Sequence, residues 1–137
     1  MPPESLPPDP ETVLFRVVEE VGDYALDAYI FVDQGIAYTV QKVHGSRKSP
    51  EQNMHVSGQQ LCEGLRELAI ERWGMLAGTV LRRWGVTGTG DFGRIVFALV
   101  ENNLLSKTEE DSIDDFKDVF DFRAAFDGPY AIELAKS

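Results

Sequence analysis

The sequence predicts a single, mostly α-helical domain, a helical bundle with a helix-turn-helix-like segment at its centre. The first observation is apolar spacing at i, i+3, i+4, i+7 and i+8, which is typical of an amphipathic helix and is followed by Phe92, Ile95, Val96, Leu99 and Val100. The second is that capping and helix-ending residues flank most apolar segments. The third is the length of 137 residues, which suits one domain with a substantial core.

The N-terminal region divides into a tail and a helix. Five of the seven prolines fall within the first ten positions, so residues 1–9 are expected to form a proline-rich, disordered tail. Asp9 followed by Pro10 is typical of an N-cap and a proline at the first helical position. Apolar residues then recur at helical spacing as far as Gly22, a helix-ending residue. A helix is therefore predicted over residues 10–21.

Residues 25–43 are ambiguous between a helix and a β-hairpin. Their aromatic and β-branched composition favours strands, and Asp33-Gln34-Gly35 suits a hairpin turn. A helical stripe nevertheless connects five apolar residues, Tyr29, Val32, Ile36, Val40 and Val43. A lone hairpin is marginal without a third strand, and no convincing third strand appears elsewhere. A helix is favoured by a narrow margin.

Two further helices are predicted before the glycine-rich stretch. Ser57 and Gln60 have capping-box spacing, which predicts a helix start, and the helix is expected to end at Trp73-Gly74. Its expected buried face consists of Leu61, Leu65, Leu68 and Ala69. A shorter helix follows, with apolar residues spaced by four at Leu76, Val80 and Trp84 and an end at Gly85. Thr89 is expected to cap the next helix, which carries the strong periodicity described above.

Residues 88–93, GTGDFG, match the dinucleotide pattern G-x-G-x-x-G. That fingerprint requires a preceding strand and an acidic residue about 20 positions on, after a second strand. Here a helix end precedes the loop, and Glu110 lies within an acidic run. Asp91 also places a negative charge in the first helical turn, where an anion would bind. We therefore expect no nucleotide and no other cofactor, with Gly85 ending one helix and Gly93 allowing close helix packing.

The segment VLRRWGVTGTGDFGRIVFALVENNLLSK resembles the core of a winged-helix or helix-turn-helix domain. In DNA-binding members of those families the second helix enters the major groove. Of the positions expected to be exposed here, Asp91, Arg94, Ala98, Glu101 and Asn102, one is basic. The net charge of −10 also disfavours binding to phosphates. Nucleic-acid binding remains the alternative function, and its candidate contacts are Arg47, Lys48, Arg82, Arg83 and Arg94.

The acidic charge is concentrated near the C-terminus. Between Thr108 and Asp127 eight acidic residues accompany two basic ones, so this segment carries −6 of the net charge. The acidic spacing lacks the glycine and closing glutamate of a calcium loop. Interspersed phenylalanines indicate a short amphipathic helix, capped by Ser112, whose acidic face is solvated or docks a basic partner. The candidate partner-binding residues are Asp111, Asp114, Asp115, Asp118, Phe116 and Phe120.

No catalytic or metal-binding constellation is predicted. His55 and Cys62 are seven residues apart and form no tight ligand pair with each other or with His44. A nucleophilic pair of Cys62 with a histidine stays open, because such partners are often distant in sequence. A deep pocket around His55 would indicate such an enzyme.

Composition also bears on location. No apolar run approaches the roughly 18 residues of a membrane span, and MPPESLPPDP lacks the features of a secretory signal. The single cysteine rules out an internal disulfide framework. A cytoplasmic protein with no membrane contact is expected.

Five stretches together, FVDQGIAYT, HVSGQQLCEGLRELA, WGVTGTGDFGRIVF, LLSKTEEDSIDDF and DFRAAF, resemble a small family of uncharacterised bacterial proteins. The resemblance covers about residues 27–126. It implies a bacterial, cytosolic protein with a single compact domain, and it implies no activity and no site residues. The globular domain is expected over residues 10–127, with a C-terminal tail at 128–137.

The leading functional hypothesis is a non-enzymatic protein-interaction or adaptor domain, acting through a protein partner or through self-association. It is favoured by the segregated charge and by the absence of a recognisable catalytic pattern. The alternatives are a nucleic-acid-binding regulator and an unrecognised enzyme.

Overall fold

The computed structural model describes residues 9–45, 56–105 and 113–127, and these residues form helices and turns with no β-strand. The α-helices are α1 (Pro10–Val21), α2 (Leu26–His44), α3 (Gly58–Trp73), α4 (Ala77–Arg83) and α5 (Thr89–Glu101). Short helical turns are η2 (Gly74–Leu76), η3 (Ile113–Phe116) and η4 (Arg123–Asp127). The predicted all-α domain is confirmed. The predicted C-terminal tail at 128–137, and the predicted N-terminal tail at 1–9 except for Asp9, lie outside the described residues.

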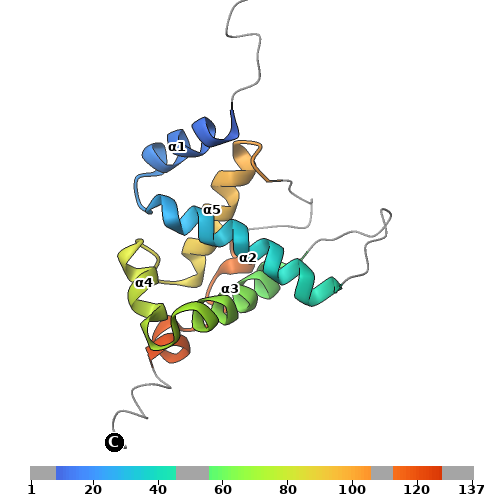
Figure 1. Ribbon diagram of the computed structural model, residues 1–137, viewed down its shortest axis with the longest axis vertical. Coiled ribbons are helices and arrows are strands. Elements are labelled where there is room, and N and C mark those ends of the chain that lie inside the picture. The colour runs from blue at the N-terminus through green and yellow to red at the C-terminus, as the bar shows by residue number, and fades with distance from the viewer. Residues whose placement is uncertain (1–8, 46–55, 106–112, 128–137) are drawn as a thin grey trace, which may run out of the picture.

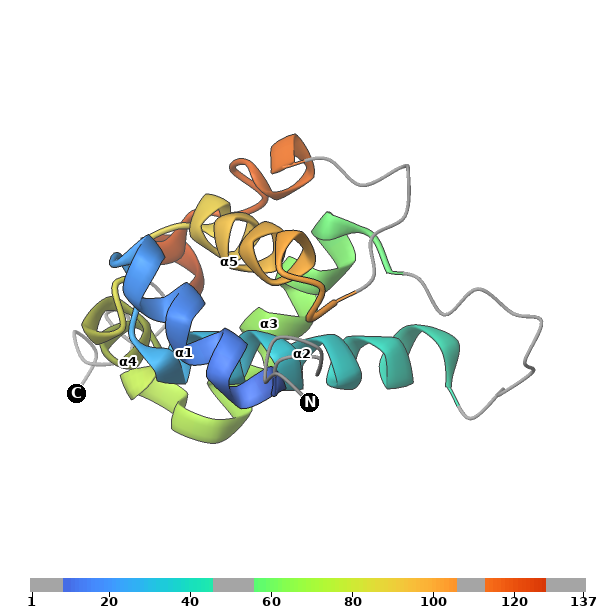
Figure 2. The same ribbon diagram turned by 90° about the horizontal axis from the view of Figure 1, so that it is seen from above.

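The helices surround one continuous apolar core (Figure 1). The α2 helix crosses the middle of the molecule and packs most extensively on α3. The α1 helix packs on α2 and α5, and α4 lies beside the start of α2, where the Ala25 N–H bonds to the Trp84 carbonyl (Figure 1). The turn η4 lies against α4 and η2. Figure 2 shows η3 on the opposite side of α5 from α1. No helix in the described part of the chain is long and apolar enough to span a membrane.

The boundaries of α1 confirm the sequence prediction. Asp9 is the extended N-cap residue and Pro10 is the first helical residue. The Asp9 side chain makes no capping hydrogen bond, although its carbonyl accepts from the Val13 N–H. Gly22 ends the helix in the left-handed conformation, with φ of 74°, and its N–H bonds to the Val18 carbonyl.

The α2 helix spans Leu26–His44, so the helix that the sequence favoured by a narrow margin over a β-hairpin for residues 25–43 is confirmed. The strand-forming composition is overridden because α3 covers one side of this helix, and burial in tertiary packing outweighs local propensity. Tyr29 and Val32 from the predicted stripe are buried, whereas Val43 is 42% exposed. Phe31, which lies off that stripe, is also buried, because its ring packs against both Trp73 and Trp84.

The crossing of α2 and α3 depends on two glycines. A Cβ atom at Gly35 would overlap with the Leu65 side chain, and one at Gly64 would overlap with Thr39. The Thr39 hydroxyl is buried, and it donates a hydrogen bond of 2.7 Å to the Gly35 carbonyl. Each glycine therefore accepts a side chain from the opposite helix.

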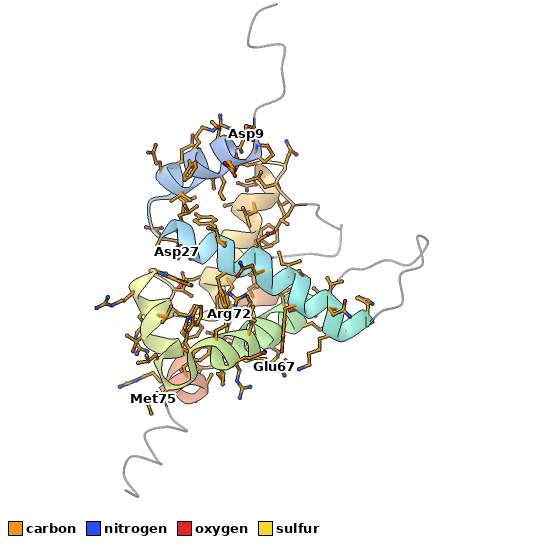
Figure 3. The ribbon with its side chains drawn as sticks, in the orientation of Figure 1. Asp9, Asp27, Glu67, Arg72 and Met75 are labelled. Carbon is orange, nitrogen blue, oxygen red and sulfur yellow. The ribbon has the colours of Figure 1, made fainter. Side chains whose placement is uncertain are left out.

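Polar contacts border this crossing. Lys42 pairs with Glu67, and the Arg72 guanidinium donates to the Gln34 amide oxygen. The two α3 residues, Glu67 and Arg72, both project from the exposed side of the helix pair (Figure 3). These contacts are exposed, so each adds little to the free energy of unfolding.

The start and buried face of α3 confirm the prediction. The Ser57 hydroxyl accepts from the Gln60 N–H at 3.0 Å, and the Gln60 amide oxygen accepts from the Ser57 N–H at 2.8 Å. All four predicted apolar residues of α3 are buried, and so is Cys62.

The apolar face predicted for α4 is wrong. Leu76 is 58% exposed, and Val80 and Trp84 are half-buried. The buried residues are instead Ala77, Gly78 and Leu81. The three residues before α4 form the tight turn η2, which changes the helical phase, and small residues let α4 pack closely. Gly85 ends α4 as predicted, with φ of 92°.

The N-cap of α5 is Gly88, so the predicted capping role of Thr89 is also wrong. Thr89 is the first helical residue and is 2% exposed, and its hydroxyl bonds to the last residue of η3 and to Val119 after it. The side chain of Asp91 bonds to the free N–H groups at this helix start instead. Of the five residues of the predicted apolar face, Phe92, Ile95 and Leu99 are buried, whereas Val96 and Val100 are half-buried.

Candidate functional site

Two features that stand out in the sequence, the GTGDFG loop and the acidic C-terminal segment, border the same shallow cleft. The cleft has a volume of about 350 Å³. Its lining residues are Thr87, Gly88, Gly90, Asp91, Arg94, Asp114 and Lys117. One side comes from the α4–α5 turn and the first turns of α5, and the other side comes from η3 and the residue after it.

Phe116 anchors the acidic segment to the helices. Its side chain is 4% exposed and packs edge-on against Phe97, with ring centroids 6.3 Å apart. Gly93 makes room for this anchor, since a Cβ atom there would lie 2.7 Å from the Phe116 Cβ. A Cβ at Gly58 would likewise lie 2.8 Å from that of Asp115. The close packing predicted for Gly93 is therefore made with η3.

The buried Thr89 hydroxyl fixes the backbone of the same segment. It donates a hydrogen bond of 2.6 Å to the Phe116 carbonyl and accepts one of 3.1 Å from the Val119 N–H. The hydroxyl thus joins the start of α5 to both ends of one turn. A buried hydroxyl with both its donor and its acceptor functions satisfied holds this turn in one position.

The acidic residues of this anchored turn differ in exposure. Asp114 and Asp118 are exposed, and Asp115 is partly buried. Asp118 adopts a φ of 49°, a left-handed conformation that aspartate tolerates better than most residues. We name Asp114, Asp115 and Asp118 the acidic surface.

Three of the predicted partner-binding residues lie outside this acidic surface. Asp111 is outside the described residues. Phe116 is in the core, so its ring is not available to a partner. Phe120 is partly buried, where it stacks on Phe122 at 5.7 Å between ring centroids and contacts Phe126.

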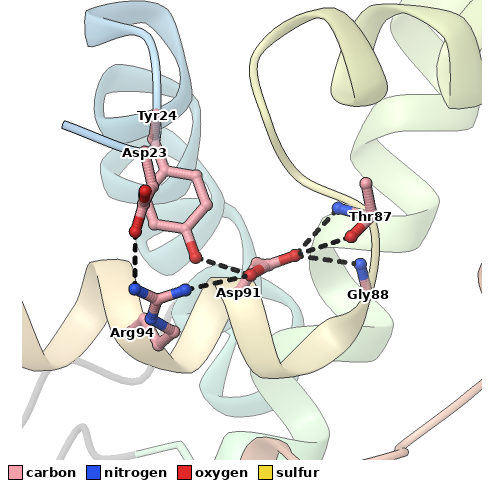
Figure 4. A network of polar contacts seen from close by, with 6 residues as sticks. All are labelled: Asp23, Tyr24, Thr87, Gly88, Asp91 and Arg94. Carbon is pink, nitrogen blue, oxygen red and sulfur yellow. Dashed lines mark hydrogen bonds and ion pairs between the residues drawn. The ribbon is translucent and has the colours of Figure 1, made fainter. Parts of the chain in front are cut away.

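A polar network centred on Asp91 stabilises the glycine-rich loop (Figure 4). One Asp91 oxygen accepts from the Thr87 N–H at 2.9 Å, the Thr87 hydroxyl at 3.2 Å and the Gly88 N–H at 3.2 Å. The other oxygen accepts from the Tyr24 hydroxyl at 2.5 Å. The carboxylate thus satisfies the N–H groups of Thr87 and Gly88, and its negative charge in the first turn of α5 opposes the binding of a phosphate there.

Tyr24 and Arg94 connect this network to the α1–α2 turn. Burial raises the pKa of the Tyr24 phenol, and the hydrogen bond to Asp91 raises it further. Arg94 donates to Asp23 at 2.7 Å and lies over the Tyr24 ring at 5.5 Å from its centroid. The hydrogen bond to Asp23 raises the pKa of Arg94. Both side chains thus join parts of the chain about 70 residues apart, which no local sequence signal indicated.

The predicted nucleic-acid contacts are not brought together in this cleft. Arg94 lines it but is paired with Asp23 and lies 3.8 Å from Asp91. Arg82 and Arg83 are exposed in the last turn of α4 and do not line it. Arg47 and Lys48 lie outside the described residues.

The residues considered for nucleophilic or metal chemistry are not grouped in the described part of the chain. Cys62 is fully buried, and burial raises the pKa of its thiol to about 12. A reactive cysteine requires the opposite shift. No cluster of three or more metal-ligating side chains occurs within residues 9–45, 56–105 and 113–127. His55 falls outside those ranges, so the pocket considered around it is not described.

Comparisons with protein-family models, with curated proteins and with solved structures found no match to this chain.

Proposed function

We propose that this chain is a non-enzymatic, cytoplasmic adaptor domain that binds a positively charged segment of a protein partner at the acidic surface. The observation that carries the proposal is the anchored acidic turn. Phe116 and Thr89 hold its backbone against α5, while Asp114 and Asp118 remain exposed beside an open cleft.

Anchoring supports binding because a surface fixed in one conformation loses little entropy when a partner docks. The net charge of −10 supports it further, since a long-range negative potential speeds association with a basic partner. Neither the fixed conformation of the surface nor the negative potential requires a catalytic group. The electrostatic attraction predicts binding that weakens as salt is added, because exposed charges are screened by ions.

A charge variant with a matched control tests this proposal. The test variant combines Asp114→Lys with Asp118→Asn, because asparagine tolerates the positive φ of position 118. The control combines Glu71→Lys with Glu19→Gln, two exposed positions on α3 and α1 that change the net charge by the same three units. Circular dichroism first establishes that both variants remain folded.

Binding is then measured in two ways. The first is fluorescence polarisation with a labelled lysine-rich peptide. The second is affinity purification from a native lysate, with and without nuclease. We expect the test variant to bind the peptide about tenfold more weakly than the control, which corresponds to about 1.4 kcal/mol, and to lose the nuclease-resistant protein partner. Equal binding by the two variants would rule out the acidic surface.

Nucleic-acid binding is the second candidate, and the exposed Arg82 and Arg83 just before the α4–α5 turn favour it. This function predicts that mixed-sequence DNA or RNA binds at low salt and dissociates steeply as salt rises. An Arg82→Gln, Arg83→Gln variant should then lose that binding. No shift of either nucleic acid in an electrophoretic assay at low salt would exclude this function.

A further inference from the structure

A second, apolar cavity lies beneath the N-terminal half of α1, apart from the cleft at α5. Its volume is about 230 Å³. The lining residues are Pro10, Glu11, Leu14, Tyr29, Ile30, Asp33, Leu99, Leu104 and Leu105. They come from α1, from α2, from the last turn of α5 and from the segment just after it. Asp9, labelled in Figure 3, marks the start of α1 above this region.

The cavity arises from incomplete packing between α1 and the helices below it. Ile30 is 40% exposed although it faces this seam, and Leu14, Leu104 and Leu105 are each only partly buried. The nearby Tyr29 hydroxyl is buried, and it has no hydrogen-bond partner among the described residues. A cavity of about 150 Å³ that is lined by aliphatic and aromatic side chains is large enough to hold a benzene ring. The seam beneath α1 therefore has room for one ring with a short side chain.

The charges around the cavity select the kind of ligand. Glu11 and Asp33 contribute carboxylates from α1 and α2, and no basic residue lines the cavity among the residues that the structure describes. The last turn of α5 carries no basic side chain either, although its carbonyls accept capping hydrogen bonds from the Asn102 amide and from the Asn103 and Leu104 N–H groups. The positive end of α1 opposes a cation, but the N-cap residue Asp9 and Glu11 in the first turn offset it. The local field favours a positive charge at the cavity mouth.

We propose that this cavity binds a small hydrophobic amine, with its apolar part between Leu14 and Leu99 and its ammonium group near Glu11 and Asp33. The site is separate from the acidic surface, and it would exist whether or not that surface binds a protein. Its acids are exposed, so the charge contributes selectivity while the apolar walls contribute most of the affinity.

The first experiment titrates the full-length protein with three probes of similar size, namely 2-phenylethylamine, ethylbenzene and phenylacetate. Amide chemical shifts of Leu99, Leu104 and Leu105 report binding. We expect saturable shifts with the amine, affinity about fivefold lower for the neutral probe at low salt, and no binding of the anion. Equal affinity for amine and neutral probe would overturn the recognition of charge. No saturable shift with any probe would overturn the site.

Variants separate this site from general attraction of amines to an acidic protein. Leu14→Trp should fill the cavity and abolish binding of the amine. Phe15→Trp is the matched control, since Phe15 is adjacent in sequence but is 55% exposed on the outer side of α1. Retained binding by Leu14→Trp would show that the amine binds elsewhere and would overturn the proposal.

A double variant, Glu11→Gln with Asp33→Asn, tests the charge without adding bulk to the cavity. It should bind the amine about fivefold more weakly, and so match the affinity of the neutral probe for the unmodified protein. Unchanged affinity for the amine would contradict the role of the two carboxylates.

Discussion

The crossing of α2 with α3 and the seam beneath α1 are both formed by helices with apolar faces, but their packing differs. At the crossing, Gly35 and Gly64 each receive a side chain from the opposite helix, and no space remains for a Cβ atom. Beneath α1, larger side chains meet imperfectly and leave a cavity of about 230 Å³. Close backbone approach allows dense interdigitation, whereas bulky residues at a wider spacing leave gaps. The crossing therefore supports stability, and the seam has room for a ligand.

The largest expected change in the free energy of unfolding is at the crossing of α2 with α3. Gly64→Ala should lower the free energy of unfolding by about 3 kcal/mol, because overlap with Thr39 outweighs the roughly 1 kcal/mol gain in helix propensity. Urea denaturation measures this change. Gly90→Ala is the control, since Gly90 lies in α5 with open space around it, and it should be neutral or slightly stabilising. Equal stability of the two variants would mean that the crossing is not densely packed.

A smaller loss is expected where α5 connects to the α1–α2 turn. Asp91→Ala removes the acceptor for Tyr24, Thr87 and Gly88, and should cost about 2 kcal/mol in thermal or urea unfolding. Tyr24→Phe removes one of these bonds and should cost about half as much. If Asp91→Ala left stability unchanged, the network would not contribute to holding α1 and α2 against α5.

The pH dependence of stability tests how completely the Cys62 thiol is buried in the densely packed α3. Burial raises the pKa of Cys62 from 9.0 to about 12, so the unfolded chain loses this proton first. The protonated Cys62 thiol therefore contributes its full share to the free energy of unfolding below pH 9. As the pH rises toward 12 this contribution is lost, and the free energy of unfolding falls by up to about 1.4 kcal/mol per pH unit. Between pH 8.5 and pH 10 the unmodified protein should lose about 1 kcal/mol more than Cys62→Ala. Parallel pH profiles would show that the thiol is accessible to water.

The smallest change in the free energy of unfolding is expected in the seam beneath α1. Leu14→Trp adds volume where there is space, and it should change the free energy of unfolding by less than about 1 kcal/mol. The contrast with Gly64→Ala is the direct comparison of the two regions, because both variants add atoms to an apolar contact. A cost as large as that of Gly64→Ala would show that the seam is as tightly packed as the crossing.

Local features of the helices were predictable from the sequence. Asp9-Pro10 and Gly22 marked the ends of α1, and the Ser57–Gln60 box marked the start of α3. The apolar periodicity of α5 predicted its buried face. Each of these signals depends on residues within one or two turns of each other, so the amino-acid order alone determines them.

Tertiary structure decided where segments distant in sequence meet. Residues 25–43 became a helix because α3 buries one of its faces, and Phe116 entered the core because Gly93 and Gly58 leave room for it. The bond from Tyr24 to Asp91 spans 67 positions. Contacts of this kind depend on how whole helices pack, which neither helical periodicity nor local propensity specifies. Sequence alone therefore determined most of the helices, and packing between them decided the cleft at α5, the anchored acidic turn and the cavity beneath α1.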